Sequence, residues 1–164
     1  MAAGPTARIT ILAPMSGRVL PLDEVPDPVF AERMLGNGLA IEPTEGLAVA
    51  PISGKLNVFH SAGHAFAIEE EATGIGVLVH VGLDTVNLHG RGFERLAEAG
   101  DVVRSGQTLL RFDLGAIAEA GLSAVSPIVL PDLDPAATIS STTATQVVAG
   151  QDVILAVNAP VSRT

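Results

Sequence analysis

The sequence of 164 residues contains no cysteine, tryptophan or tyrosine, and its 9 lysines and arginines face 18 aspartates and glutamates. Without cysteine the chain forms no disulfide, no thiolate metal site and no cysteine nucleophile. The net charge of −9 argues against nucleic acid and against an anionic membrane surface as partners. No apolar run approaches the roughly 20 residues of a membrane span, and the first eight residues lack the apolar stretch of a secretory signal. We therefore expect a cytoplasmic protein without direct membrane insertion.

The chain is instead rich in turn-forming residues, with 17 glycines and 11 prolines beside a hydrophobic fraction of 48%. This composition predicts short strands separated by tight turns rather than long helices. A chain of this length buries near 70% of its unfolded surface, which is enough for one core. We expect a single, mainly β domain.

An internal repeat organises the chain. The hexapeptide APMSGR at Ala13–Arg18 recurs as APISGK at Ala50–Lys55, and a looser pair relates Val102–Leu110 to Val147–Leu155. Two repeated pairs in the same order indicate a duplication. The duplication predicts a closed β-sandwich or barrel with approximate two-fold symmetry and without open strand edges.

Helical signals are short. Phe30–Leu35, Gly92–Glu98 and Leu114–Ala120 each offer one or two turns bounded by glycine or proline. None carries the sustained apolar stripe of a core helix. We expect 132–145, which is small and polar, to be a connection that holds at most a short helical turn.

Two of the four histidines lie in runs with the alternation of strands. The run GVLVHVG contains His80, and the run GHAFAI contains His64, with a polar, glycine-containing segment between them. A hairpin centred near Ala72 would pair His64 with His80 and Phe66 with Leu78. The paired Cβ atoms would lie about 5 Å apart, so both imidazoles could act on one group. Their apolar neighbours would form a patch suited to docking a protein.

Three kinds of chemistry are open to such a pair. The two histidines could bind a metal, with Asp84 in the sequence His80-x-x-x-Asp84 as a further ligand. They could act as a general acid and base on a small molecule. One could accept a phosphoryl group covalently while the other donates a hydrogen bond to it.

The run Gly74–Val86, with the sequence GIGVLVHVGLDTV, resembles the active-histidine signature of the glucose-type enzyme IIA domain of the bacterial phosphoenolpyruvate-dependent sugar phosphotransferase system. The resemblance extends through four further segments, Ala13–Gly17, Asp27–Glu32, His64–Phe66 and Gly90–Phe93. It covers 9–158, which we expect to form the domain between short tails at 1–8 and 159–164. The family's fold is a duplicated-hybrid β-sandwich of antiparallel strands with a few short helices, which agrees with the repeat.

The resemblance assigns roles to particular residues. His80 matches the histidine that accepts the phosphoryl group from the phosphocarrier HPr and passes it to a cysteine on the IIB domain of a sugar permease (IICB). His64 matches the histidine that stabilises this group, and Asp84 and Thr85 lie next to the site. The resemblance also implies an apolar docking rim, made of Phe30, Phe59, Phe66 and Leu78.

Many members carry a threonine two residues before the supporting histidine, hydrogen-bonded to the active one, but here that position is Ala62. The tautomer of His80 must then be set by a backbone carbonyl or by Thr85. Leu78 stands where some members have an aromatic residue.

The resemblance implies no required cofactor, although some regulatory complexes share a zinc ion between a partner carboxylate and residues matching His64 and His80. It also implies regulatory partners for the unphosphorylated form and transient contact with the inner membrane face through the permease.

Two rival classes share parts of these motifs. The APMSG segment resembles segments of biotinyl and lipoyl carriers, but a carrier needs a lysine on an exposed turn. The chain's one lysine, Lys55, lies within the second copy of the repeat, at the position that Arg18 occupies in the first copy. A zinc peptidase of the duplicated-hybrid class shares the spacing from His80 to Asp84, but no His-x-His motif follows. Both classes fit less well than phosphotransfer.

Overall fold

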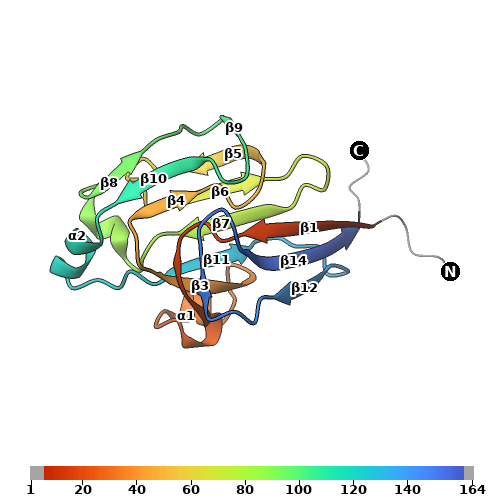
Figure 1. The fold of residues 1–164 in the computed structure, drawn as a ribbon, viewed down its shortest axis with the longest axis horizontal. Coiled ribbons are helices and arrows are strands. Elements are labelled where there is room, and N and C mark those ends of the chain that lie inside the picture. The colour runs from red at the N-terminus through yellow and green to blue at the C-terminus, as the bar shows by residue number, and fades with distance from the viewer. Residues whose placement is uncertain (1–5, 161–164) are drawn as a thin grey trace.

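The computed structural model describes residues 6–160, whose strands form three antiparallel sheets (Figure 1). The largest sheet has eight strands in the order β13 (Gln146–Val147), β2 (Gly17–Pro21), β3 (Asn37–Pro43), β11 (Ser126–Leu130), β7 (Gly76–His80), β6 (Ala65–Glu69), β5 (Gly54–Phe59) and β9 (Val102–Val103). Two three-stranded sheets have the orders β1 (Thr6–Leu12), β14 (Val153–Pro160), β12 (Thr138–Ser141) and β4 (Leu47–Val49), β10 (Thr108–Phe112), β8 (Phe93–Arg95). The helical elements are η1 (Leu22–Glu24), α1 (Pro28–Ala31), η2 (Thr85–Leu88) and α2 (Leu114–Glu119).

The main hydrophobic core lies between one face of the large sheet and the two smaller sheets. It joins residues such as Phe66 and Val79 of the large sheet to Leu110 of β10 and Leu155 of β14, all of them fully buried. A second, smaller cluster covers the opposite face of the large sheet, where η1 and α1 pack Leu22 and other side chains against β3 and β11. The structure therefore confirms the predicted mainly β, sandwich-like fold. No helix among residues 6–160 is long and apolar enough to cross a membrane.

The sequence repeat is also a repeat of hydrogen bonds. The carbonyl of Ala13 accepts a hydrogen bond from the Gly150 amide at 2.9 Å, and in the second copy the carbonyl of Ala50 accepts one from the Gly106 amide at 2.8 Å. The first APxSG copy thus bonds to the last repeated segment, 147–155, and the second copy bonds to the segment 102–110. This arrangement fits the duplication that the sequence predicts.

Side chains and crossing bonds follow the same symmetry. Ser16 Oγ accepts from the Ala149 amide and Ser53 Oγ from the Ser105 amide, both at 2.9 Å. The residue before each repeat donates to the proline of the other copy, because the Leu12 amide bonds to the carbonyl of Pro51 and the Val49 amide to the carbonyl of Pro14. The two APxSG segments therefore meet at the centre of the sandwich.

The hairpin of β6 and β7 has a register one residue different from the predicted one. Ala65, rather than His64, lies opposite His80, and Phe66 lies opposite Val79. The cause is the connection, which holds six residues because the Glu70 amide donates to the carbonyl of Ile75. The observed register puts Phe66 on the core face with Val79, whereas the predicted one would have placed it opposite the half-buried Leu78.

Two of the local predictions were wrong, and two were confirmed with changed limits. The segment 92–98 contains the edge strand β8 instead of a helix, because Phe93 pairs with Phe112 of β10 and their rings stack at 6.3 Å. The connection 132–145 contains strand β12, which pairs with β14. α2 forms as predicted, and α1 begins earlier, at Pro28, because the Asp27 carboxylate accepts from the Val29 amide.

Strands β1 and β14 extend beyond the expected limits of the domain. Thr6 pairs with Pro160 and Arg8 with Asn158, so 6–8 and 159–160 belong to the paired strands instead of to tails. The rest of the two expected tails, 1–5 and 161–164, lies outside the described residues.

Candidate functional site

The rings of His64 and His80 lie side by side, with their centroids 5.3 Å apart and their planes at 68°. His80 is the last residue of β7, and alternation puts it with Leu78 on the face opposite Val77 and Val79. His64 precedes β6 and accepts a backbone hydrogen bond from Val81 through its carbonyl. Its side chain leaves the strand alternation in a bend that includes Gly63, whose φ is +91°. The bend brings the rings together although the two residues do not pair.

The tautomer of His80 is fixed by the backbone. Its Nδ1 lies 2.7 Å from the carbonyl oxygen of Gly82. A carbonyl only accepts, so Nδ1 carries the proton and Nε2 keeps its lone pair. Of the two alternatives for replacing the missing threonine, the structure selects the carbonyl, because the Thr85 hydroxyl donates to the carbonyl of Val81.

The segment that carries this carbonyl is tightly held. The Gly82 amide donates to Ser126 Oγ at 3.0 Å, and Ser126 is fully buried. Gly82 has a φ of +73°, and a Cβ there would lie 2.5 Å from Cγ2 of Thr85 and 2.9 Å from the carbonyl oxygen of Ser123. Thr85, which is buried, therefore packs beneath the loop that positions His80. Gly82 and Ser126 gave no recognisable signal as site residues in the sequence.

Both histidines are neutral at physiological pH. Burial, followed by the nearby His80 and His60, lowers the pKa of His64 from 6.5 to about 4. Burial also lowers the pKa of His80, although the Gly82 carbonyl and the carboxylates of Asp27 and Asp84 oppose the shift. A neutral imidazole with a free Nε2 is a competent nucleophile toward phosphorus.

Two carboxylates on different elements, those of Asp27 and Asp84, act electrostatically to raise the pKa of His80. Asp84 is exposed, has a φ of +57° and begins η2, while Asp27 begins α1. The sequence pointed to Asp84 through its spacing from His80, but it gave no reason to select Asp27. Among residues 6–160, no three His, Asp or Glu side chains converge as metal ligands.

The phenylalanines expected in a docking rim lie beneath the surface. Phe66 is fully buried in the main core, and Phe59 packs on it with ring centroids 5.6 Å apart. Phe30 is buried as well, and its ring centroid lies 5.4 Å from that of His80. Only Leu78 is partly exposed. The register of the hairpin and the position of α1 explain this correction, because they turn the three rings inward, where Phe30 supports His80 instead of offering a contact surface.

A third histidine belongs to the cluster. The ring of His60 lies 4.2 Å from that of His64, and His60 Nδ1 accepts a hydrogen bond from the Ala62 amide at 3.0 Å. His60 is exposed and shares a shallow hollow of about 300 Å³ with the exposed His89. His60 lies only four residues before His64 in the sequence, and the structure brings the two rings into direct contact.

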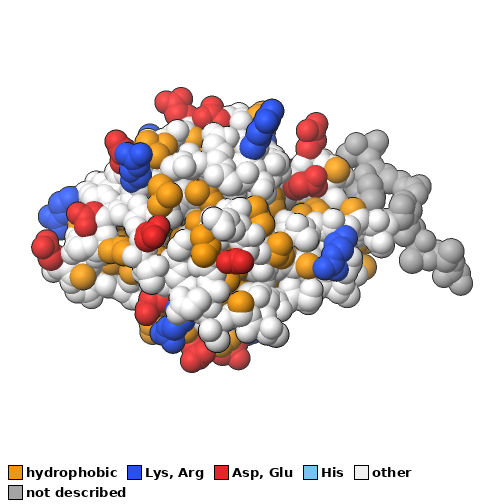
Figure 2. All heavy atoms as spheres, viewed as in Figure 1, with side chains coloured by type: hydrophobic (Ala, Val, Ile, Leu, Met, Phe, Trp, Pro, Cys, Tyr) orange, Lys and Arg blue, Asp and Glu red, His pale blue; other side chains and the backbone are white. Residues whose placement is uncertain are grey.

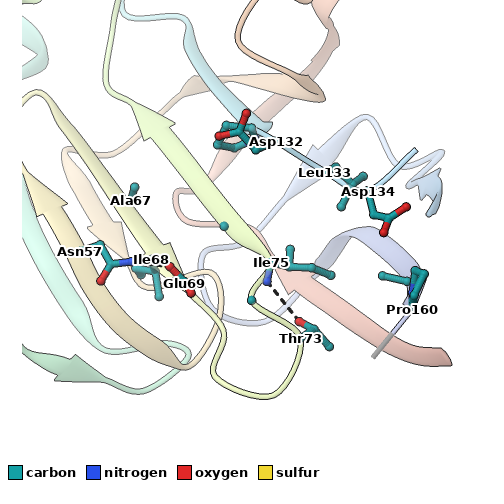
Figure 3. A pocket seen from close by; sticks show the side chains of 14 residues that line it. Asn57, Ala67, Ile68, Glu69, Thr73, Ile75, Asp132, Leu133, Asp134 and Pro160 are labelled. Atoms are coloured by element: carbon teal, nitrogen blue, oxygen red, sulfur yellow. Dashed lines mark hydrogen bonds between the residues drawn. The ribbon is translucent and has the colours of Figure 1, made fainter. Parts of the chain in front are cut away.

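A separate hollow of about 400 Å³ lies at the other end of the β6–β7 hairpin (Figure 3). Thr73 and Ile75 of the hairpin connection line one side, and Asp132 and Asp134 line another. The hollow contains no histidine. Four residues of extended strand separate the two ends of the hairpin by roughly 13 Å, so the hollow is distinct from the histidine cluster.

The remaining candidate residue, Lys55, is not placed as a carrier lysine would be. Lys55 lies within strand β5, opposite Glu69 and Val102, instead of on the hairpin turn that a biotinyl or lipoyl carrier needs. The face of the described residues in Figure 2 shows acidic and basic side chains scattered without a large patch of one sign, and no histidine is visible on it.

Comparisons with known proteins agree with one another. A model of the family described as phosphoenolpyruvate-dependent sugar phosphotransferase system, EIIA 1, matches residues 9–135. A PTS system glucose-specific EIIA component of Oceanobacillus iheyensis is 40% identical over 149 residues, which are 91% of this chain and 90% of that protein. The component of the same name in Bacillus cereus is 46% identical over 134 residues, 81% of this chain and 80% of that one. The fold is similar to the glucose permease IIA from Mycoplasma capricolum, with a TM-score of 0.84, 38% identity, and coverage of 92% and 96% of the two chains.

Proposed function

The chain belongs to the EIIA 1 family of the phosphoenolpyruvate-dependent sugar phosphotransferase system, and on this premise we propose that it is a phosphoryl carrier with His80 as the residue that is phosphorylated. The donor is HPr, and the acceptor is the IIB domain of a sugar permease. The glucose-specific name of two relatives supports a glucose-type permease as the partner. The carrier works in the cytoplasm and at the inner face of the membrane, where it meets the permease.

The single observation that carries the proposal is the state of the His80 ring. Its Nδ1–H is held by the Gly82 carbonyl, and its lowered pKa leaves Nε2 with a free lone pair at neutral pH. In the forward step, Nε2 attacks the phosphorus of phospho-HPr, the new P–N bond forms, and the old P–N bond breaks with its electron pair returning to HPr. In the second step a thiolate of IIB attacks the phosphorus, and the electron pair of the breaking bond returns to Nε2.

His64 is proposed to stabilise the phosphoryl group. Its Nδ1 is buried without a hydrogen-bond partner among the described residues, so Nε2 is the ring nitrogen that a group on His80 can reach. A neutral ring that carries its proton on Nε2 donates to a phosphoryl oxygen without adding a charge in the resting protein. Charge-assisted hydrogen bonds of this type are about twice as strong as neutral ones.

The surroundings of the pair suit a labile phosphohistidine. His64 is only 5% exposed, and Phe30 packs against His80. Apolar walls reduce the access of water to the P–N bond. Asp84 and Asp27 offer acceptors for cationic side chains of a docking partner, which fits the acidic balance of the chain.

We also propose that a zinc ion shared with a partner would use His64 and His80. The two rings fit half of a tetrahedral zinc site, and Nε2 of His80 is available because Nδ1 is engaged. The remaining two ligands, including the expected carboxylate, would come from the partner or from water. In the unphosphorylated protein Nε2 of His80 is free for the ion, and Nε2 of His64 would bind it on loss of its proton.

The proposal is tested by the intact mass of the protein after incubation with phosphoenolpyruvate, enzyme I and HPr. We expect one acid-labile phosphoryl group on the wild type and none on His80→Ala. His89→Asn is the matched control, since His89 is an exposed histidine whose φ of +51° suits asparagine. Absence of the phosphoryl group from the wild type, with an HPr that is itself phosphorylated, would overturn the proposal.

A further inference from the structure

We propose that His60 is a positioning residue for this transfer, because its ring, held by the Ala62 amide, forms the wall that keeps His64 beside His80. The inference rests on the proposed function. It concerns how this chain holds its supporting histidine, His64.

The ring of His64 needs an external support. Its Nδ1 is buried and has no hydrogen-bond partner among the described residues, so no acceptor or donor fixes the ring at that atom. Its orientation must come from the groups packed on it. The two aromatic neighbours within ring contact are His80, at 5.3 Å between centroids, and His60, at 4.2 Å. His60 is the nearer of the two and lies against His64 with an interplanar angle of 53°.

His60 is itself held at three points. Its Nδ1 accepts from the Ala62 amide at 3.0 Å, its amide donates to the carbonyl of Ala65 at 2.9 Å, and its carbonyl accepts from the Gly63 amide at 2.8 Å. These bonds close the loop from residue 60 to residue 65 around His64. An exposed histidine is normally free to rotate, and here the side-chain bond removes that freedom.

The same bond shows that His60 is not a second phosphoryl acceptor. Because Nδ1 accepts a hydrogen bond, the neutral ring carries its proton on Nε2, and neither nitrogen offers a free lone pair. The role that remains is to support its neighbour. Misplacement of a reacting group by about 1 Å can cost up to 10²-fold in rate, so a packed wall at this position has a kinetic consequence.

Three variants separate the ring from the hydrogen bond. His60→Phe keeps an aromatic wall but loses the acceptor, His60→Asn keeps an acceptor for the amide two residues on but loses the ring, and His60→Ala loses both. We expect each variant to accept phosphoryl from phospho-HPr as the wild type does. Transfer to a glucose-type IIB domain that the wild type phosphorylates should slow about tenfold in His60→Ala and His60→Asn, and His60→Phe should recover part of the rate.

The decisive comparison is a double-mutant cycle. If His60 acts through His64, adding His60→Ala to His64→Ala slows transfer to IIB no further, whereas independent effects would multiply. His89→Asn is the control and should leave both steps unchanged. Urea unfolding of each variant is measured alongside, and His60→Asn, which also loses the ring, serves in place of His60→Ala if the latter is destabilised.

The outcomes distinguish the two proposals. A wild-type protein that accepts no phosphoryl group overturns the proposed function. A wild type that transfers normally, with His60→Ala or His60→Asn equal to it in both steps, overturns the role of His60. So does a multiplicative effect in the double mutant, or a loss of acceptance equal to the loss of transfer.

Discussion

The ring of His80 is held at Nδ1 by the carbonyl oxygen of Gly82, 2.7 Å away and two residues further along the chain. A backbone acceptor therefore does what a side-chain hydroxyl would otherwise do, and Ala62 in place of threonine leaves the tautomer of His80 fixed. The carbonyl can serve because Gly82 turns with a φ of +73° over Thr85. The tautomer and orientation of the nucleophilic His80 ring thus depend on Gly82, which takes no part in the transfer itself.

Gly82→Ala should be markedly more destabilising than Gly121→Ala. Both glycines have nearly the same φ, +73° and +74°, but a Cβ at Gly121 meets no atom within 4 Å, whereas one at Gly82 lies 2.9 Å from the backbone oxygen of Ser123. The control should lose about 1–2 kcal/mol through its backbone conformation alone. Gly82→Ala should lose about 1–3 kcal/mol more through overpacking. Urea unfolding at pH 7 measures both, and equal losses would contradict the account.

His64→Ala, which removes the ring and its hydrogen-bond donor, should still accept a phosphoryl group but pass it on poorly. Acceptance needs the lone pair of His80, which the substitution leaves in place, while transfer needs the donor that steadies the phosphoryl group. Loss of one such donor costs about 10²-fold in rate. Single-turnover transfer to a IIB domain measures the effect. Transfer at the wild-type rate would remove His64 from the mechanism.

Stability should fall between pH 7 and pH 5 through His64. The unfolded ring titrates near 6.5, but the folded ring, with a pKa of about 4, stays neutral, so at pH 5 the unfolded chain binds the additional proton. Protonation then favours unfolding by roughly 2 kcal/mol at pH 5, and the loss continues until the pH reaches the folded pKa. His80 acts in the same direction. Urea unfolding at both pH values should show a smaller loss for His64→Gln, and an equal loss would contradict the shift.

Gly17→Ala and Gly54→Ala should be destabilising to similar extents, because the repeat places both glycines in the same packing. A Cβ would lie 2.1 Å from the carbonyl oxygen of Glu42 in the first copy and of Glu69 in the second. Each substitution should cost about 1–3 kcal/mol or more. Gly76→Ala, in β7 with no atom within 4 Å of its Cβ, is the control and should cost little. Thermal or urea unfolding checks the three, and tolerance of either repeat variant would argue against the shared packing.

The fold class and the proximity of His64 and His80 could be predicted from the sequence, because both depend on local patterns. The APxSG repeat marks equivalent turns, and the alternation around His80 reports its face correctly. Hairpin register is different. It depends on how many residues the connection holds, and the bond from Glu70 to Ile75 that sets this number has no distinctive sequence signal.

Features that arise from tertiary contacts were also missed. Phe93 lies in a strand because Phe112 of β10 pairs with it. The sequence of 92–98 alone contains no signal that identifies this partner strand. Phe66 was expected at the surface because the predicted register placed it there. The contact between His60 and His64 depends on the bend at Gly63, which the spacing of the two histidines does not reveal.

The most direct test of the central claim is the position of the phosphoryl group within the phosphorylated protein. Histidine-selective ¹⁵N labelling and NMR of the protein phosphorylated by HPr identify the modified residue and the modified ring nitrogen. We predict a phosphoryl group on Nε2 of His80 alone, with Nδ1 still protonated and bonded to the Gly82 carbonyl. Phosphorylation of Nδ1 of His80, or of His60, His64 or His89, would contradict the account.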